Sequence, residues 1–259
     1  MSVAGPGLGP GRTVGPMLAW AVIFDPGCPG AMVHRSSMYS AVSSAAVSPF
    51  PSSTGTGLQT ARFGPGQGGA ALRALRQRLR DEQGEPVGVE DDALEMSATT
   101  VAVVEGGQAV AALRLHAADT PPLRRDLGTL LHLERFAGIW PAETIVVGSR
   151  LNVLADYRIR PVMDTMLRET YRLVRDSGVR FGLINCAPEL QALFAFYGFH
   201  EYLPPAILPG GNAVLRMALV CEYATGFRAC GSPLLDLVQQ PELGQAGHAW
   251  LVQAFPMLA

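Results

Sequence analysis

Two arginines lie just before a proline that can begin a helix. Arg158 and Arg160 precede Pro161. Apolar residues then recur at helical spacing until Gly178 ends the pattern. The N-terminus of a helix presents unpaired backbone N–H groups and a partial positive charge, and two guanidinium groups beside it would add donors for a phosphate. The pattern predicts a phosphate-binding position, with two merely solvated arginines as the alternative.

Two further arginines lie within segments that are otherwise apolar. Arg114 interrupts the apolar run at residues 109–115, and Arg150 follows the apolar start of the segment 144–154. A buried guanidinium needs an anionic partner because an unpaired charge is costly to bury. Both arginines are therefore candidates for binding a substrate carboxylate, and an internal salt bridge with Glu134 or Glu143 is the alternative.

The cysteines and histidines show no pattern of a metal or redox site. Cys186 directly follows a predicted strand and precedes a helix, where some enzymes place a nucleophile, but no histidine has a recognisable relation to it. The four cysteines lack any close Cys-x-x-Cys pairing, and the five histidines are scattered. We therefore expect reduced thiols, a cytoplasmic protein and no metal.

Strands and helices alternate in the region that must position these residues. The β-branched segment 144–154 predicts a buried strand, and a helix is expected over 161–177. A second short strand follows at 180–185 and a second helix at 188–197, before a turn at 198–199 leads into another strand. Such alternation predicts parallel pairing of the strands.

The order of these elements resembles that of the GNAT acyltransferase superfamily. The likeness extends to Ser-Arg-Leu-Asn-Val at 149–153 followed by Tyr157, and to the stretch 193–202 with its Gly-Phe pair. Within the superfamily the chain is most similar to N-acyl amino acid synthases and acyl-homoserine-lactone synthases, which take a fatty acyl group from acyl carrier protein. The resemblance covers residues 62–223, where an arginine-rich helix at 72–80 and an acidic stretch at 90–92 agree with it.

The resemblance implies an α/β fold with a GNAT-like mixed central sheet flanked by helices. Two neighbouring parallel strands, beginning near Ile145 and Phe181, would diverge and leave a wedge for a pantetheine-linked acyl group. Backbone N–H groups near Leu151 would polarise the thioester carbonyl. The expected pantetheine-binding residues are Arg158, Arg160, Val153 and Asn185, and the expected substrate-binding residues are Arg114, Arg150, Phe194 and Tyr197.

Transfer of an acyl group from a thioester to an amine also needs a route for the ammonium proton. The available titrating groups are Glu143, Glu134 and His132. None has a spacing that distinguishes it from an ordinary surface residue. We take Glu143 and Glu134 as the candidate bases.

Three departures from the family pattern shape the prediction. The segment 158–163 has no glycine where acetyl-CoA-dependent members have a glycine-rich pyrophosphate loop, so we expect an acyl carrier protein donor with one phosphate, and CoA as the alternative. Phe194 occupies the position of a tyrosine that often protonates the leaving thiolate, and we expect Tyr197 on another helix face. Val147 replaces a glutamate typical of lactone synthases, which makes a lactone product less expected and leaves Glu143 as a displaced candidate.

Composition divides the chain of 259 residues into three parts. Residues 1–60 are rich in Gly, Pro, Ser and Ala, which predicts a low-complexity, disordered extension. Residues 61–223 form the single predicted domain, and 224–259 form a tail that packs on it or covers an acyl tunnel. The apolar run at 17–24 is too short for a membrane span, and we expect no secretory signal.

Charge excludes one class of partner. The net charge is −2, whereas a nucleic-acid-binding protein normally has a basic face. All 20 basic residues are arginine, which is typical of a GC-rich bacterial genome. Those on the helix at 72–80 are also suited to an acidic carrier protein, with a merely solvated helix face as the alternative.

The predicted function is N-acyl transfer of a medium or long chain from acyl carrier protein to the amine of an amino acid or similar small molecule. The alternatives are a CoA-dependent acetyltransferase and a catalytically inactive module that binds an acylated carrier or a metabolite. No tightly bound cofactor is expected beyond the pantetheine arm of the donor.

Overall fold

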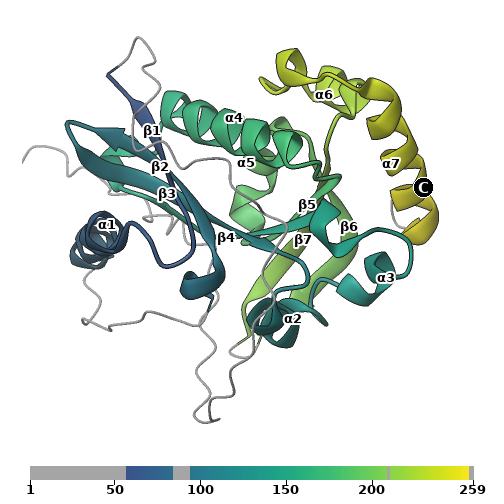
Figure 1. Ribbon diagram of the computed structural model, residues 1–259, viewed down its shortest axis with the longest axis horizontal. Coiled ribbons are helices and arrows are strands. Elements are labelled where there is room, and N and C mark those ends of the chain that lie inside the picture. The colour runs from purple at the N-terminus through teal and green to yellow at the C-terminus, as the bar shows by residue number, and fades with distance from the viewer. Residues whose placement is uncertain (1–56, 84–93, 209–210, 257–259) are drawn as a thin grey trace, which may run out of the picture.

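The computed structural model describes residues 57–83, 94–208 and 211–256, which form a seven-stranded sheet with helices on both faces (Figure 1). The strands are β1 (Gln59–Phe63), β2 (Thr99–Glu105), β3 (Gln108–Ala117), β4 (Ile145–Val153), β5 (Phe181–Cys186), β6 (Phe199–Ile207) and β7 (Ala213–Val220). The α-helices are α1 (Gly69–Gln83), α2 (Pro121–Leu127), α3 (Leu133–Ala137), α4 (Arg160–Asp176), α5 (Gln191–Phe196), α6 (Ala224–Cys230) and α7 (Pro241–Ala254). Short 3₁₀ turns include η2 (Ala142–Thr144) and η5 (Leu235–Leu237).

The sheet is mixed, as expected. Its strand order is β1-β2-β3-β4-β5-β7-β6. Only β4 and β5 pair in parallel, and all other neighbours are antiparallel. The parallel pair needs a crossover connection, which α4 supplies between the two strands. The mixed α/β sheet predicted from the sequence is confirmed.

Helices cover both faces of the central strands, so nearly all residues of β3 and β5 are buried. Figure 1 shows α4 on one side of β1–β3 and α1 on the other. The face of α4 towards the sheet is apolar and includes Val162, Met166, Leu167 and Val174, which are buried. At the other end of the sheet, α2, α3 and α7 pack over a second core that includes Phe181. β4 and β5 lie between these two ends, in the middle of the sheet.

The tail after residue 223 contacts both the sheet and α4. Trp250 of α7 packs its ring against Phe136 and Phe181, with ring centroids 5.1 and 5.3 Å apart. Arg168 of α4 forms paired hydrogen bonds of 2.7 Å with Asp236 in η5. Of the predicted extension 1–60, residues 1–56 lie outside the described residues, whereas Gln59 and Thr60 belong to β1. The acidic stretch 90–92 and the apolar run 17–24 lie wholly outside them.

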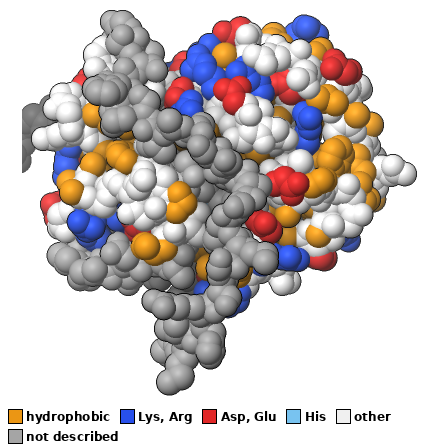
Figure 2. Space-filling model, viewed as in Figure 1, with side chains coloured by type: hydrophobic (Ala, Val, Ile, Leu, Met, Phe, Trp, Pro, Cys, Tyr) orange, Lys and Arg blue, Asp and Glu red, His pale blue; other side chains and the backbone are white. Residues whose placement is uncertain are grey.

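The surface of the described residues carries charges of both signs. On the side shown in Figure 2, arginine and acidic side chains are interspersed. None of the described helices is long and apolar enough to cross a membrane.

Candidate active site

The ladder between β4 and β5 ends before the strands do. Parallel pairing runs from Ile145 opposite Phe181 to Gly148 opposite Ile184. β4 then continues beside β3, whereas β5 continues to Cys186 beside β7. The two strands are no longer hydrogen-bonded to each other at their carboxyl ends, and we call this interval the β4–β5 gap. Ligands of α/β proteins bind at the carboxyl ends of parallel strands.

A bulge in β4 lies within the β4–β5 gap. Arg114 pairs with Ser149 and Ala112 with Asn152, so two residues, Arg150 and Leu151, oppose one residue of β3. The half-buried Arg150 has a φ of 47°, a left-handed conformation that costs free energy for a residue with a side chain. Bulges re-aim backbone groups and recur beside active sites. The bulge coincides with the stretch expected to polarise a carbonyl.

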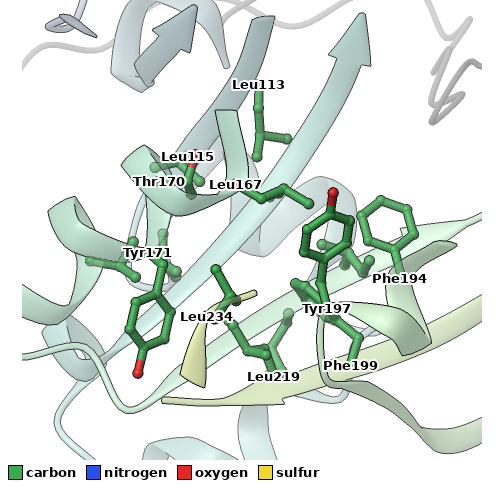
Figure 3. Close-up of a pocket in the computed structure, with 16 residues that line it drawn as sticks. Leu113, Leu115, Leu167, Thr170, Tyr171, Phe194, Tyr197, Phe199, Leu219 and Leu234 are labelled. Carbon is green, nitrogen blue, oxygen red and sulfur yellow. The ribbon is translucent and has the colours of Figure 1, made fainter. Parts of the chain in front are cut away.

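A small apolar cavity lies under α4 where the two strands separate. Its volume is about 40 Å³, enough for about three water-sized spheres. Gly148 and Gly182 leave this part of the sheet without side chains, so the hollow forms between the bare backbone and α4. Its other walls include Leu113, Leu115, Leu167, Phe194, Tyr197 and Leu234 (Figure 3).

Phe194 and Tyr197 both line this cavity (Figure 3). The expectation that they occupy different helix faces is wrong, because residues three apart lie on the same side of a helix. The Tyr197 hydroxyl donates to Asp164 Oδ1 at 2.7 Å, and burial together with this acceptor raises the pKa of Tyr197 well above its usual value. The Tyr197 hydroxyl is therefore hydrogen-bonded to α4, and Phe194 has no hydroxyl group.

The side of the β4–β5 gap away from α4 is polar. His116 and Ser149 are hydrogen-bonded, with 2.8 Å between Nε2 and Oγ, and are 1% and 6% exposed. Asn185 is 1% exposed, and its Nδ2 donor has no hydrogen-bond partner among the described residues. Side chains of adjacent strand residues point to opposite faces, so all three lie opposite to Gly148 and Ile184. The gap has one apolar side and one polar side.

Arg114 is held on the polar side by a carboxylate of the protein. Its Nη2 lies 2.9 Å from Glu95 Oε2, and Arg76 of α1 contacts the same carboxylate at 2.5 and 2.8 Å. The salt-bridge alternative is thus realised for Arg114, with Glu95 as the partner instead of Glu134 or Glu143. The Arg114 guanidinium is therefore paired within the protein.

Arg158 and Arg160 lie at the N-terminus of α4, as predicted. Arg158 Nε donates to the carbonyl of Val153 at 3.2 Å. Arg160 lies over the ring of Phe196, with its guanidinium carbon 4.5 Å from the centroid, and 3.5 Å from Asp164. Its side chain is 66% exposed, and the first turn of α4 has neither an acidic residue nor a side-chain cap. This end of α4 is chemically suited to an anion.

The predicted bases do not gather at the β4–β5 gap. Glu143 is exposed in η2, at the amino end of β4, and the eight residues to Leu151 span about 25 Å of strand. Glu134 is exposed on α3 and forms a 2.8 Å contact with His132 Nδ1. Neither carboxylate has a contact with a residue of the gap. The structure places the buried His116 there instead.

Cys186 is buried at the end of β5. Burial raises the pKa of its thiol to about 12, and its Sγ lies 3.6 Å from Met217 Sδ. Such a thiol is a poor nucleophile because the thiolate is the reactive form. Within the described ranges, no three His, Cys, Asp or Glu residues are grouped so that they could hold a metal ion.

Sequence reasoning missed His116, Ser149 and Glu95. One signal was present, because Arg114 and His116 alternate with leucines in β3 and so mark one polar face of a strand. Nothing in the sequence indicates that Ser149, 33 residues away, is the partner of His116.

No protein-family model matches the sequence, and no curated protein matches it. Solved structures do match the fold. FeeM, an N-acyl amino acid synthase from uncultured soil microbes, is 13% identical with a TM-score of 0.51 over 70% of this chain and 99% of FeeM. TofI, solved in a ternary complex with an inhibitor and MTA, is 18% identical with a TM-score of 0.50 over 71% of this chain and 98% of TofI.

A third structure is BjaI, a CoA-dependent acyl-homoserine lactone synthase solved with SAM and isopentyl-CoA. It is 16% identical, with a TM-score of 0.49 over 73% of this chain and 97% of BjaI. FeeM and TofI have a GNAT-like fold. The resemblance seen in the sequence is thus confirmed at the level of the fold: this chain has the fold of the GNAT acyltransferases.

Proposed function

We propose that this protein is an N-acyltransferase that moves an acyl chain from acyl carrier protein to the amine of an amino acid or a similar small molecule. The observation that carries the proposal is the chemical asymmetry of the β4–β5 gap. Its α4 side is an apolar cavity, whereas its other side carries the buried polar groups of His116, Ser149 and Asn185. An acyl group suits the first side, and a polar acceptor suits the second.

The reaction joins an amine nitrogen to a thioester carbonyl carbon and breaks the carbon–sulfur bond. A donor that polarises the carbonyl lowers the barrier, and the backbone N–H groups at the bulge near Leu151 are the proposed donors. The pantetheine arm would pass between β4 and β5, beside Val153 and Asn185. The unpaired Nδ2 of Asn185 is suited to an amide carbonyl of that arm.

The size of the cavity limits the acyl chain. A volume of about 40 Å³ does not hold a medium or long chain without rearrangement. Such a chain therefore requires the leucine side chains of the wall to move, or most of the chain to extend along the mouth of the cavity. A comparison of short and long donors distinguishes a fixed pocket from one that opens.

The proposed donor is acyl carrier protein because the segment before α4 suits a single phosphate. None of residues 158–163 is glycine and none has a positive φ, so this backbone lacks the glycine-rich form that wraps a pyrophosphate. Arg158 and Arg160 would meet the phosphate of the arm. Arg73 and Arg78 are exposed on α1 and would attract an acidic carrier protein.

A direct test measures thiol release from a panel of acyl carrier protein thioesters, two to sixteen carbons long, with a mixture of amino acids. We expect thiol release with matching N-acyl product by mass spectrometry, and slower release from the same acyl-CoA thioesters. Arg160→Gln should raise KM for the carrier thioester with little change in kcat. Arg172→Gln, at a half-exposed arginine further along α4, is the matched control.

Two results would replace this proposal. Saturable acetyl-CoA turnover without carrier-protein turnover would favour the CoA-dependent alternative. Binding of the acylated carrier without turnover would favour an inactive binding module. A specific observation supports that second candidate, since Phe194 has no hydroxyl and the Tyr197 hydroxyl is engaged with Asp164.

A further inference from the structure

The β4–β5 gap contains a buried hydroxyl–imidazole pair whose role the acyl-binding groups do not explain. Ser149 is the first β4 residue after the last pair with β5, and its hydroxyl lies 2.8 Å from His116 Nε2. Both side chains are almost wholly buried. A hydroxyl held against an imidazole in a site poor in water is an arrangement that moves protons.

We propose that Ser149 and His116 form the proton relay for the acceptor amine, with Ser149 contacting the amine and His116 taking the proton. This inference rests on the proposed function. His116 is then the base that acyl transfer needs, in place of Glu134 and Glu143.

A second observation indicates that a ligand contacts this place. Asn185 is the first β5 residue after the same last pair, so Ser149 and Asn185 occupy matching positions on the two separating strands and point to the same side. The Nδ2 donor of Asn185 is buried and has no partner in the described part of the chain. Such a donor costs free energy unless a ligand or water accepts from it. A ligand atom that satisfies Asn185 would therefore lie beside the Ser149 hydroxyl.

Three arginines on this side have partners away from the Ser149–His116 pair. Arg114 and Arg76 contact Glu95, and Arg216 on β7 donates to the carbonyls of Pro204 and Leu130. The carboxylates proposed from the sequence are exposed and contact neither residue of the pair. His116 is thus the titratable group that touches the hydroxyl at the gap.

The proton inventory of the step balances. The acceptor ammonium gives one proton to Ser149 Oγ, while the Ser149 hydroxyl proton passes to His116 Nε2. The freed amine nitrogen bonds to the thioester carbonyl carbon, the carbon–sulfur bond breaks, and a second proton of that nitrogen leaves with the thiolate as the thiol. His116 then releases its proton to solvent, so the products are an amide, a free thiol and one proton, and the relay is restored.

The test compares Ser149→Ala and His116→Gln with wild type in the carrier-thioester assay. Gln keeps a group that can hydrogen-bond to Ser149 but cannot carry the proton. We expect kcat to fall on the order of 100-fold or more in both, with KM for the donor nearly unchanged. Hydroxylamine, which is largely unprotonated at neutral pH, should restore much of the rate. Ser177→Ala and His248→Gln are matched controls.

A second pair keeps the test valid if Ser149→Ala folds poorly. Ser149→Thr retains the hydroxyl and Ser149→Val has nearly the same shape without it, so Thr should keep most of kcat and Val should lose it. Wild-type protein that releases no thiol overturns the proposed function and the relay with it. If the wild type is active and both His116→Gln and Ser149→Val keep a kcat within threefold of it, the relay alone is overturned. The relay is also overturned if the variants lose as much rate with hydroxylamine as with amino acids.

Discussion

The buried carboxylate of Glu222 connects the tail to the body of the protein, and its removal should destabilise the fold by a predictable amount. Glu222 lies two residues after the end of β7, is 2% exposed and has a φ of 67°. Its carboxylate accepts from the backbone N–H of Gln239 at 2.5 Å, from that of Gln240, and from the Tyr171 hydroxyl at 3.1 Å. The two backbone donors immediately precede α7, so this carboxylate holds the start of that helix.

The magnitude follows from these contacts. A hydrogen bond to a charged group contributes about 1.5–3 kcal/mol net and a neutral one about 1 kcal/mol, so Glu222→Gln, which weakens two such bonds, should cost about 2 kcal/mol. Glu222→Ala leaves both backbone donors without an acceptor and should cost about 4 kcal/mol. For a protein of this size, 1 kcal/mol corresponds to about 2–4 °C in Tm.

Thermal unfolding and urea titration measure both values. Limited proteolysis shows in addition whether the chain opens near residue 239 before the rest unfolds. Glu242→Gln is the control, because Glu242 is exposed in the first turn of the same helix and its change should stay within about 0.5 kcal/mol. A Glu222→Gln protein as stable as that control would refute the role given to this carboxylate.

Four further results are expected. Gly182→Ala should be neutral or stabilising by about 0.5 kcal/mol in urea unfolding, because the new Cβ would lie 3.7 Å from its nearest neighbour. Gly148→Ala, whose Cβ would lie 3.1 Å from a methyl carbon, should cost about 1–2 kcal/mol in the same assay. Iodoacetamide should label Cys230 at pH 8 well before Cys186, as peptide mass spectrometry will show, because burial raises the pKa of the Cys186 thiol to about 12. Burial also lowers the pKa of His200, so the folded protein takes up this proton less readily than the unfolded chain. Stability should therefore fall as the pH drops below the ordinary histidine value of about 6.5, and His200→Gln should reduce that loss in urea titrations at pH 7 and pH 5.5.

Local signals allowed the central elements to be predicted. The expected strand at 144–154 is β4 at Ile145–Val153, and the expected helix at 161–177 is α4 at Arg160–Asp176. β-branched residues, a proline at the first helical turn and a glycine after the last one act within a few residues of where they stand. For that reason they are visible in a single sequence.

The partners of charged and polar side chains could not be predicted in the same way. Arg114 pairs with Glu95, 19 residues away, because the ladder places β3 beside the turn that carries Glu95. His116 meets Ser149 for a similar reason, since the register of β3 and β4 sets which side chains are diagonal neighbours. Register depends on the whole sheet, and it decides which titrating group reaches the site. The catalytic and binding roles named from the sequence remain predictions.

The β4 bulge explains how one strand can keep an apolar side and a polar side up to its end. Before the bulge, Gly148 faces the cavity under α4 and Ser149 faces away from it. Beyond it, Val153 pairs with Ala111 and so returns to the cavity side, in phase with Leu113. In a regular strand Val153 would lie on the same side as Ser149, and the polar side would then contain an apolar residue at its end. The strained conformation of Arg150 thus lets β4 keep an apolar side and a polar side beyond its last pair with β5, which is the arrangement that the proposed acyl transfer requires.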